Sequence, residues 1–352
     1  MKSFEYIRPK TVQDAVAAAS MPGAAYLAAG TNLVDLMKGG VIGPDRLVDV
    51  THLPGLDRIE TLGDGSVRIG ALVRNADLAH DAAFARSFPS VAEALLSGAS
   101  AQLRNAATVG GNLLQRTRCA YFYDVASACN KRDPGAGCEA RGGDTRLHAV
   151  LGWSESCIAT HPSDFCVPLV ALDAVVEIEG QTGHREVPLE AFHRLPGITP
   201  DVETVLAPGD MIVAVRLPAE AARFAKHTRY LKVRDRTSYA FAVVSAAAAL
   251  HLDGDRIIAA RLALGSVAMK PWRAWAAEDS LAGAVSGPES FRRAAEIALA
   301  DAKPSGDNAF KIELARRIII RACTLAAAGT PDRVSALPAS PFASIPGVHL
   351  HA

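Results

Sequence analysis

The stretch from residue 115 to 165, in which hydrophobic periodicity fades, constrains the fold more than any other part of the chain. Glycine, proline, charged residues and cysteine dominate it, and five of the six cysteines lie between Cys119 and Cys166. Ordinary compact domains rarely keep so long a loop unless it binds something or has a function. In a long chain that begins without an apolar secretory core, such clustering favours metal or redox chemistry over a disulfide framework.

Four of these thiols are candidate metal ligands: Cys119, Cys129, Cys138 and Cys157. Their spacing lacks the two C-x2-C knuckles of a zinc ribbon and the compact run of a ferredoxin. It does place four thiolates in a flexible loop that could surround an iron–sulfur cluster. Basic neighbours would offset the negative charge of such a cluster: Arg116, Arg118, Lys131 and Arg132. Structural zinc and unligated thiols are the alternatives.

The remaining two cysteines are interpreted differently. Cys166 is expected to be a small buried apolar residue, with replacement of Cys157 as a ligand as the alternative. Cys323 lies on the apolar face of the last predicted helix and is expected in the core.

Two glycine turns could bring the backbone close to a phosphate or a flat ligand. The first, YLAAGTNLV at 26–34, joins a predicted strand to a predicted helix, so backbone N–H groups and the helix dipole can bind phosphate oxygens. The second, ATVGGNL at 107–113, has paired glycines that permit close approach of the backbone. Taken alone, each is more often a structural turn. Neither matches the dinucleotide-binding or P-loop fingerprint.

Hydrophobic patterning predicts an α+β fold. A helix is predicted at 11–20 with Thr11 as its N-cap, and another is predicted to begin at Ser90 with a capping box completed by Glu93. Strands are predicted at 47–50, 67–71, 174–179 and 211–218. After residue 223, apolar runs predict antiparallel strands at 230–233, 240–250 and 257–264, followed by helices at 289–301 and 308–328.

Composition argues against two classes of partner. The 352 residues carry 37 basic and 37 acidic side chains, so no broad electrostatic field indicates nucleic acid or an anionic membrane. The longest apolar stretch, at 239–250, is too short to span a bilayer. We therefore expect no nucleic-acid partner and no membrane insertion, in a chain of two or three domains.

Four motifs in order carry a resemblance to a known family: GTNLVDLM at 30–37, LRNAATVGGNL at 103–113, HPSDFCVPLVALDA at 161–174 and YLKVRDRTSYAFAVVSAA at 230–247. Over nearly all of residues 1–328 the chain resembles the FAD-binding subunit of the xanthine oxidase family. The cysteine insert is similar to that of the bacterial aldehyde oxidoreductase trimers of periplasmic type. Those trimers, like 4-hydroxybenzoyl-CoA reductase, carry a 4Fe–4S cluster there.

The resemblance implies the domain organisation. Residues 1–220 would be a FAD-binding domain of the vanillyl-alcohol-oxidase (PCMH) type, with lobes at about 1–60 and 61–220 and the cysteine-rich insert at 115–166. A C-terminal α+β domain of the carbon monoxide dehydrogenase flavoprotein type would occupy 223–330, with an extended tail at 331–352.

The resemblance also implies the cofactor contacts. FAD would lie between the lobes, with its pyrophosphate on the first turn: Tyr26, Leu27, Ala28, Ala29, Gly30, Thr31, Asn32, Leu33 and Val34. Thr108, Gly111 and Asn112 would line a second contact near the ring and ribityl chain. Asp164 would hydrogen-bond the cofactor and Lys232 would lie beside the ring, unless it is a solvated strand-end lysine. Cys119, Cys129, Cys138 and Cys157 match the ligands of the 4Fe–4S cluster.

The family implies a role in electron transfer. An aldehyde would be oxidised to a carboxylate at a molybdenum cofactor on a separate large subunit. Electrons would pass through 2Fe–2S clusters of a small subunit to FAD here, and then to an external acceptor, for which we expect a quinone, ferredoxin or oxygen rather than NAD. Location in the periplasm, by co-export with a signal-bearing partner, is expected, with the cytoplasm as the alternative. The rival functions are a self-contained FAD-dependent reductase or oxidase and a zinc-braced scaffold.

Overall fold

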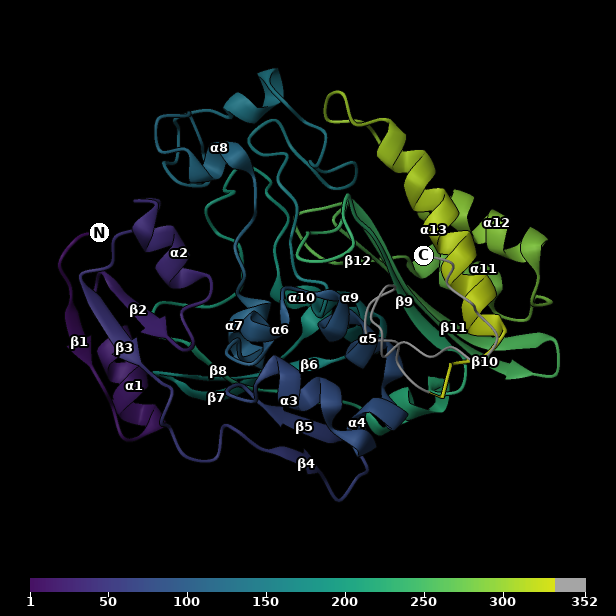
Figure 1. Cartoon of the computed structure of the whole chain (residues 1–352), viewed down its shortest axis with the longest axis horizontal. Coiled ribbons are helices and arrows are strands. Elements are labelled where there is room, and N and C mark those ends of the chain that lie inside the picture. The colour runs from purple at the N-terminus through teal and green to yellow at the C-terminus, as the bar shows by residue number, and fades with distance from the viewer. Residues whose placement is uncertain (333–352) are drawn as a thin grey trace.

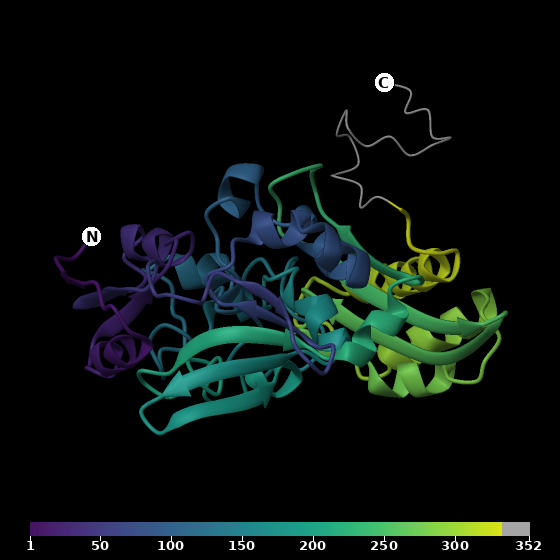
Figure 2. The same cartoon turned by 90° about the horizontal axis from the view of Figure 1, so that it is seen from below.

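The computed structural model describes residues 1–332, which form three β-sheets placed one after another along the long axis of the molecule (Figure 1). Seen from below in Figure 2, the N-terminal sheet (purple) and the C-terminal sheet (green) lie at opposite ends. Strands and helices are mixed throughout, so the predicted α+β class is confirmed. The predicted tail lies outside the described residues from position 333 onward.

The N-terminal sheet is parallel. Its strands, in spatial order, are β1 (Glu5–Ile7), β3 (Arg46–Asp49) and β2 (Ala24–Leu27). Parallel neighbours need a crossover, which helices α1 (Val12–Ala19) and α2 (Leu33–Lys38) help to supply. The side chain of Thr11 caps α1 by accepting a hydrogen bond from the backbone N–H of Asp14 at 3.1 Å, as predicted. The first glycine turn therefore lies between β2 and α2, at an end of this sheet.

The central sheet is antiparallel and has five strands. In spatial order they are β4 (Ile59–Thr61), β5 (Val67–Gly70), β8 (Met211–Leu217), β6 (Val175–Gly180) and β7 (Gly183–Pro188). Between β5 and β6 the chain forms α3 (Asn75–His80), α4 (Ala82–Ser87), α5 (Pro89–Ser97), α6 (Ala101–Arg104), α7 (Val109–Leu113), α8 (Ala120–Tyr123) and α9 (Cys166–Ala171). Short helices α10 (Leu189–Phe192) and a 3-10 helix (Ala219–Phe224) follow later. Phe88, Phe165 and Phe192 belong to the core that joins sheet and helices.

The C-terminal sheet is also antiparallel, in the order β12 (Trp272–Arg273), β11 (Arg256–Gly265), β10 (Val244–Asp253) and β9 (Thr228–Val233). Helices α11 (Trp275–Leu281), α12 (Pro288–Ala298) and α13 (Phe310–Ala327) share one core with this sheet. The predicted strand at 240–250 begins four residues later, and α11 was not predicted. Cys323 is fully buried on the inner face of α13, as expected.

The cysteine-rich insert forms a separate lobe at the top of Figure 1, next to α8. Apart from α8 and a 3-10 turn at Glu139–Gly142, it is irregular. Isolated antiparallel bridges pair Cys129 with Cys138 and Ser154 with Cys157. Irregular backbone of this kind needs side chains or a ligand to hold it, because it has few ladder hydrogen bonds of its own.

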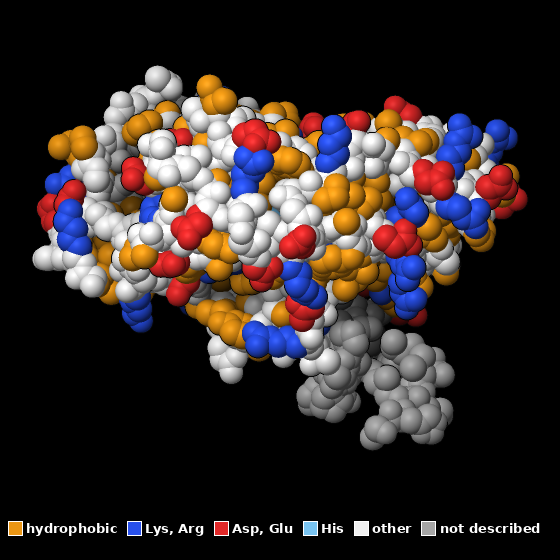
Figure 3. All heavy atoms as spheres, turned by 90° about the horizontal axis from the view of Figure 1, so that it is seen from above, with side chains coloured by type: hydrophobic (Ala, Val, Ile, Leu, Met, Phe, Trp, Pro, Cys, Tyr) orange, Lys and Arg blue, Asp and Glu red, His pale blue; other side chains and the backbone are white. Residues whose placement is uncertain are grey.

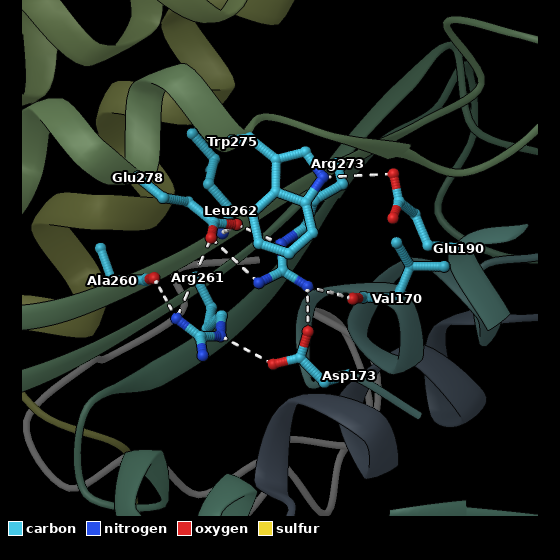
Figure 4. A network of polar contacts seen from close by, with 9 residues as sticks. All are labelled: Val170, Asp173, Glu190, Ala260, Arg261, Leu262, Arg273, Trp275 and Glu278. Carbon is cyan, nitrogen blue, oxygen red and sulfur yellow. Dashed lines mark hydrogen bonds and ion pairs between the residues drawn. The ribbon is translucent and has the colours of Figure 1, made fainter. Parts of the chain in front are cut away.

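A buried ion-pair network fastens the C-terminal domain to α9 (Figure 4). Arg273 donates to both carboxylate oxygens of Glu278, to Asp173 Oδ1 at 2.8 Å and to the carbonyl of Val170 at 2.6 Å. Only 1% of the Arg273 side chain is exposed. The guanidinium also stacks on Trp275, 4.0 Å from the ring centroid. An arginine with a partner at each of its three nitrogens fixes the relative position of the two domains.

One local prediction is wrong. Ser90 does not cap a helix, because α5 begins at Pro89 with Phe88 at the N-cap position. Glu93 is instead buried and turned toward the C-terminal domain, where it pairs with Arg229 at 2.9 Å and accepts from the backbone N–H of Tyr230 at 2.7 Å. A long-range partner for the carboxylate outweighs the local capping box.

Two findings on the surface bear on partners. Lysine and arginine are interspersed with aspartate and glutamate over the face drawn in Figure 3, without a large field of one sign. Among residues 1–332, none of the helices has the length and apolar character needed to cross a membrane.

Candidate functional site

The first glycine turn forms one wall of a cavity of about 220 Å³ between the N-terminal and central sheets. Seven of its nine predicted residues line the cavity: Tyr26, Ala28, Ala29, Gly30, Thr31, Asn32 and Leu33. Leu27 and Val34 do not. Gly30 has φ +72°, and a Cβ there would lie 2.7 Å from Val34 Cγ2, so the turn needs glycine both for its backbone conformation and for space.

Asn32 is the most informative residue in this wall. Its Oδ1 accepts a hydrogen bond from the backbone N–H of Arg116 at 2.9 Å, which fixes the amide. Its Nδ2 is buried and makes no hydrogen bond of standard geometry within the described residues, although the amide lies near enough to the Tyr123 hydroxyl to act to lower the pKa of that group. A buried donor without a partner is rare and costly, so this amide suits a ligand oxygen such as that of a phosphate.

The second glycine turn lines the opposite part of the same cavity through Thr108, Gly110 and Gly111. A Cβ on Gly110 would lie 3.0 Å from Ala71 Cβ, so this glycine lets α7 pack closely on the chain after β5. The structure therefore brings the two predicted turns, about eighty positions apart in sequence, to one cavity. That juxtaposition distinguishes a ligand site from two unrelated structural turns.

Asn112, also predicted, is buried beside the cavity rather than in its wall. Its Oδ1 accepts from Ser163 Oγ at 2.7 Å and from Gln115 Nε2 at 2.5 Å. It therefore holds α7 against the segment that leads into α9. Its predicted contact with a cofactor stays a prediction.

Asp164 and Lys232 form a buried ion pair at the junction of the central and C-terminal domains. Lys232 Nζ lies 2.7 Å from Asp164 Oδ2, and the hydroxyl of Tyr230 donates to Asp164 Oδ1 at 2.5 Å. Burial, then the neighbouring Asp164 charge, raises the pKa of Tyr230 well above its usual value. Neither Asp164 nor Lys232 lines the 220 Å³ cavity. The structure thus joins the two predicted residues to each other, and their contact with a cofactor stays a prediction.

All four predicted metal ligands line a second, smaller cavity inside the insert: Cys119, Cys129, Cys138 and Cys157. Cys166 does not line it; it begins α9 and is fully buried there. The geometry therefore favours Cys157 over the alternative ligand Cys166. The six cysteines, all within residues 1–332, form no disulfide with one another.

Backbone N–H groups are directed at three of the four sulfurs. Burial raises the pKa of Cys119 to about 12. The backbone N–H groups of Phe122 and Tyr121 act in the opposite direction and lower this pKa. Burial likewise raises the pKa of Cys138 and of Cys157, and N–H donors oppose the shift at both, among them Ala159 N–H, 3.5 Å from Cys157 Sγ. Donors aimed at sulfur stabilise thiolates, the form in which cysteine binds metals.

The spread of the four sulfurs distinguishes kinds of metal. Zinc–sulfur bonds of about 2.3 Å place tetrahedral sulfur atoms about 3.8 Å apart. Among the described residues, one group of three or more potential ligand atoms lies within 4.8 Å of one another, and it consists of His161, Cys166 and His193. No three of the four cysteine sulfurs therefore lie within 4.8 Å of one another, a wider spread than that of ligands on a single zinc ion.

A chain of charged groups joins the two cavities. Lys131, predicted as a basic neighbour of the cysteines, is buried at the cysteine cavity and acts to lower the pKa of Cys157. Glu203 accepts from Lys131 Nζ at 2.8 Å and from Arg116 Nε at 2.6 Å. Arg116 lines the 220 Å³ cavity. Glu203 was not predicted, because it lies far along the chain in a loop without a motif.

A third cavity, of about 400 Å³, lies between the other two. It shares Leu114 and Arg116 with the first and Thr117 with the cysteine cavity. The four residues at 114–117 therefore separate the cavity of the glycine turns from the cysteines, so that groups bound in the two would be near neighbours.

Comparison with known proteins identifies relatives over nearly all of residues 1–332. The family model described as the FAD binding domain in molybdopterin dehydrogenase matches residues 2–220, and the carbon monoxide dehydrogenase flavoprotein C-terminal domain matches 229–326. The chain is 50% identical, over 91% of its length and 96% of the relative, to the aldehyde oxidoreductase FAD-binding subunit PaoB of Escherichia coli.

Solved structures show the same fold. Carbon monoxide dehydrogenase from Hydrogenophaga pseudoflava is similar with a TM-score of 0.73 at 28% identity, covering 93% of this chain and 98% of that one. Quinoline 2-oxidoreductase from Pseudomonas putida 86 is similar with a TM-score of 0.71 at 25% identity, covering 93% and 99%.

Proposed function

The chain belongs to the family of FAD-binding subunits of molybdopterin dehydrogenases, and from this premise we propose that it is the electron-transferring subunit of an aldehyde oxidoreductase and holds a 4Fe–4S cluster as well as FAD. The observation that carries the proposal is the placement of two cavities on either side of the segment 114–117. One has a glycine wall and an unpartnered amide, and the other has four cysteines.

The residues of the first cavity fit FAD. The left-handed Gly30 gives the turn its close approach, and Asn32 Nδ2 offers an unused donor to a pyrophosphate oxygen. Thr108 and Gly111 provide a second polar wall. FAD, when bound, exchanges electrons both in pairs and singly, so it can join a two-electron oxidation to one-electron carriers.

The insert fits a 4Fe–4S cluster. It supplies four thiols in one cavity, N–H groups aimed at the sulfurs and a buried lysine to offset negative charge. Cys129 and Cys157 are buried, so the insert also excludes water from the site. Such a cluster carries single electrons, and the short segment 114–117 would keep it close to FAD.

The remaining partners follow from the family and from the 50% identical relative, which is named as an aldehyde oxidoreductase subunit. We infer that a large subunit with the molybdenum cofactor oxidises the aldehyde and that a small 2Fe–2S subunit delivers the electrons. This chain would orient FAD between that donor and an external acceptor. The oxidation itself would take place on the large subunit.

Analysis of the anaerobically purified complex tests the proposal. We expect FAD and, beyond the iron and sulfide of the 2Fe–2S clusters on the small subunit, about four iron and four sulfide per copy of this chain. Serine at Cys119, Cys129, Cys138 or Cys157 should lower the iron content, while Cys166→Ser and Cys323→Ser, outside the cavity, should retain it. Zinc in place of iron at the four cysteines would overturn the proposal of a 4Fe–4S cluster but would leave the assignment of FAD intact. A well-folded complex without flavin would overturn the main proposal, and turnover by this chain alone would favour a self-contained flavin enzyme.

A further inference from the structure

One side chain reaches a sulfur of the cysteine cavity from outside the set of ligands. His148 Nε2 lies 3.2 Å from Cys119 Sγ, and the ring is buried. The other groups directed at the sulfurs are backbone N–H groups within the insert. Replacing His148 can therefore remove a contact to the sulfur of Cys119 without changing any of the four cysteines or the backbone.

The C-terminal domain holds His148 in position. Its carbonyl oxygen accepts from Lys311 Nζ at 2.8 Å and from Asn308 Nδ2 at 3.0 Å. Both side chains are fully buried, and Lys311 also donates to the carbonyls of Leu147 and Ser266. Lys311 and Asn308 thus hold the backbone at 147–149, which places the buried ring beside Cys119.

The chemistry of a metal-bound thiolate decides which atom donates. A thiolate ligand has no proton and can only accept a hydrogen bond, so the hydrogen at this contact must be on His148 Nε2. The other ring nitrogen, Nδ1, is buried and has no partner among residues 1–332. Hydrogen bonds to ligand sulfur stabilise the more negative, reduced state of an iron–sulfur cluster and so raise its reduction potential.

We propose that His148 is a positioning residue that donates a hydrogen bond to the Cys119 ligand and raises the reduction potential of the 4Fe–4S cluster. The proposal rests on the presence of the cluster proposed above. It assigns to the C-terminal domain, through Lys311 and Asn308, a part in setting the potential of a site formed by the insert.

The experiment compares the purified complex with His148→Phe, which removes the donor, and His148→Gln, which keeps an N–H group. The matched control is His184→Phe, because His184 is exposed on β7 and pairs with Glu179. Iron content is measured first, and then the midpoint potentials of cluster and flavin are measured separately by spectroscopic titration. We expect a more negative cluster potential in His148→Phe, at least partial recovery in His148→Gln and no change in His184→Phe.

A second measurement does not depend on any variant folding. In the reduced wild-type complex labelled with nitrogen-15 histidine, pulsed electron paramagnetic resonance should detect a histidine nitrogen coupled to the cluster. Absence of this coupling, or full iron content with an unchanged cluster potential in His148→Phe, would overturn the role of His148. Wild-type complex whose iron is only that of the 2Fe–2S clusters would instead overturn the cluster on which this role rests.

Discussion

Lys131 and Glu203 form an ion pair, 2.8 Å between Nζ and Oε1, that joins the cysteine-rich insert to the loop before β8. Only 1% of the lysine side chain is exposed, and it also donates to the carbonyl of Pro200 at 2.8 Å. The second oxygen of the same carboxylate holds Arg116 at 2.6 Å. One carboxylate thus pairs with two cations that belong to neighbouring cavities.

Glu203→Gln is expected to destabilise the fold and weaken cluster retention. Loss of the carboxylate leaves a buried ammonium without its counter-charge, which costs up to several kcal/mol in a buried pair. Because a quarter of the Glu203 side chain is exposed, we expect about 2 kcal/mol, measured as the free energy of unfolding in urea. The exposed Glu186→Gln, which pairs with Arg216, should cost less than about 0.5 kcal/mol.

A double-mutant cycle separates this pair from a general effect on folding. If the ion pair carries the effect, Lys131→Met combined with Glu203→Gln should cost clearly less than the sum of the two single changes. Simple additivity would show that the two residues act independently.

Gly30→Ala is expected to weaken FAD binding at least tenfold, about 1.4 kcal/mol. The new Cβ would lie 2.7 Å from Val34 Cγ2 and would displace the wall of the cavity. Gly40→Ala is the matched control, because Gly40 has nearly the same φ, +71°, but nothing within 4 Å of the added Cβ. Both variants bear the cost of a left-handed alanine. When the flavin-free protein is titrated with FAD, the dissociation constant should therefore change less than about twofold in Gly40→Ala. An equal loss of affinity in both variants would show that the turn is not part of the FAD site.

The parts of the site that could be predicted from sequence are those with local signals. A glycine turn and a cysteine cluster are visible in short windows, and the order of four motifs identified the family. Alternating or continuous apolar runs predicted most long strands of the central and C-terminal sheets. Boundaries were predicted less accurately, as at β10 (Val244–Asp253), where the apolar run begins in the loop before the strand.

The parts that could not be predicted depend on partners distant in sequence. Lys131 and Glu203 are 72 positions apart, and Lys311 and His148 are 163 apart. Neither pair has a periodic or motif signal, because their meeting depends on how three domains pack. The same reason made the capping box at Glu93 wrong, since a partner 136 positions away, Arg229, takes its carboxylate.

Arg273→Met is expected to lower the free energy of unfolding by about 3–5 kcal/mol, because it leaves the buried Glu278 carboxylate without its partner (Figure 4). Adding Glu278→Gln should recover part of this loss, since the uncompensated charge is then removed as well. Arg317→Met, in an exposed pair with Glu313 on α13, should change stability by less than about 0.5 kcal/mol. Urea unfolding of the three variants measures these differences, and an Arg273→Met protein as stable as the wild type would show that the network does not fasten the domains.

A buried histidine pair is expected to make the fold sensitive to mild acid. His161 and His193 lie with ring centroids 4.4 Å apart. Burial lowers the pKa of His193 to about 4, and burial followed by the neighbouring His193 lowers the pKa of His161 well below its usual value. In the unfolded chain the pKa of each ring would be about 6.5.

The sign of the pH dependence follows from proton binding. Between pH 6.5 and 4 the unfolded state binds more protons than the folded state, so acid favours unfolding and stability falls as the pH is lowered through this range. Each ring contributes a slope of up to about 1.4 kcal/mol per pH unit. Between pH 6 and 4.5, the wild-type unfolded state should bind more protons than the folded state, and His193→Gln should reduce this excess by about one proton. The excess is obtained from the slope of the free energy of unfolding against pH, measured by urea unfolding at several pH values. Replacement of the exposed His184 by Gln should leave the slope unchanged. A His193→Gln protein with the full wild-type slope would mean that the ring at 193 is protonated in the folded state and that its burial does not keep it neutral.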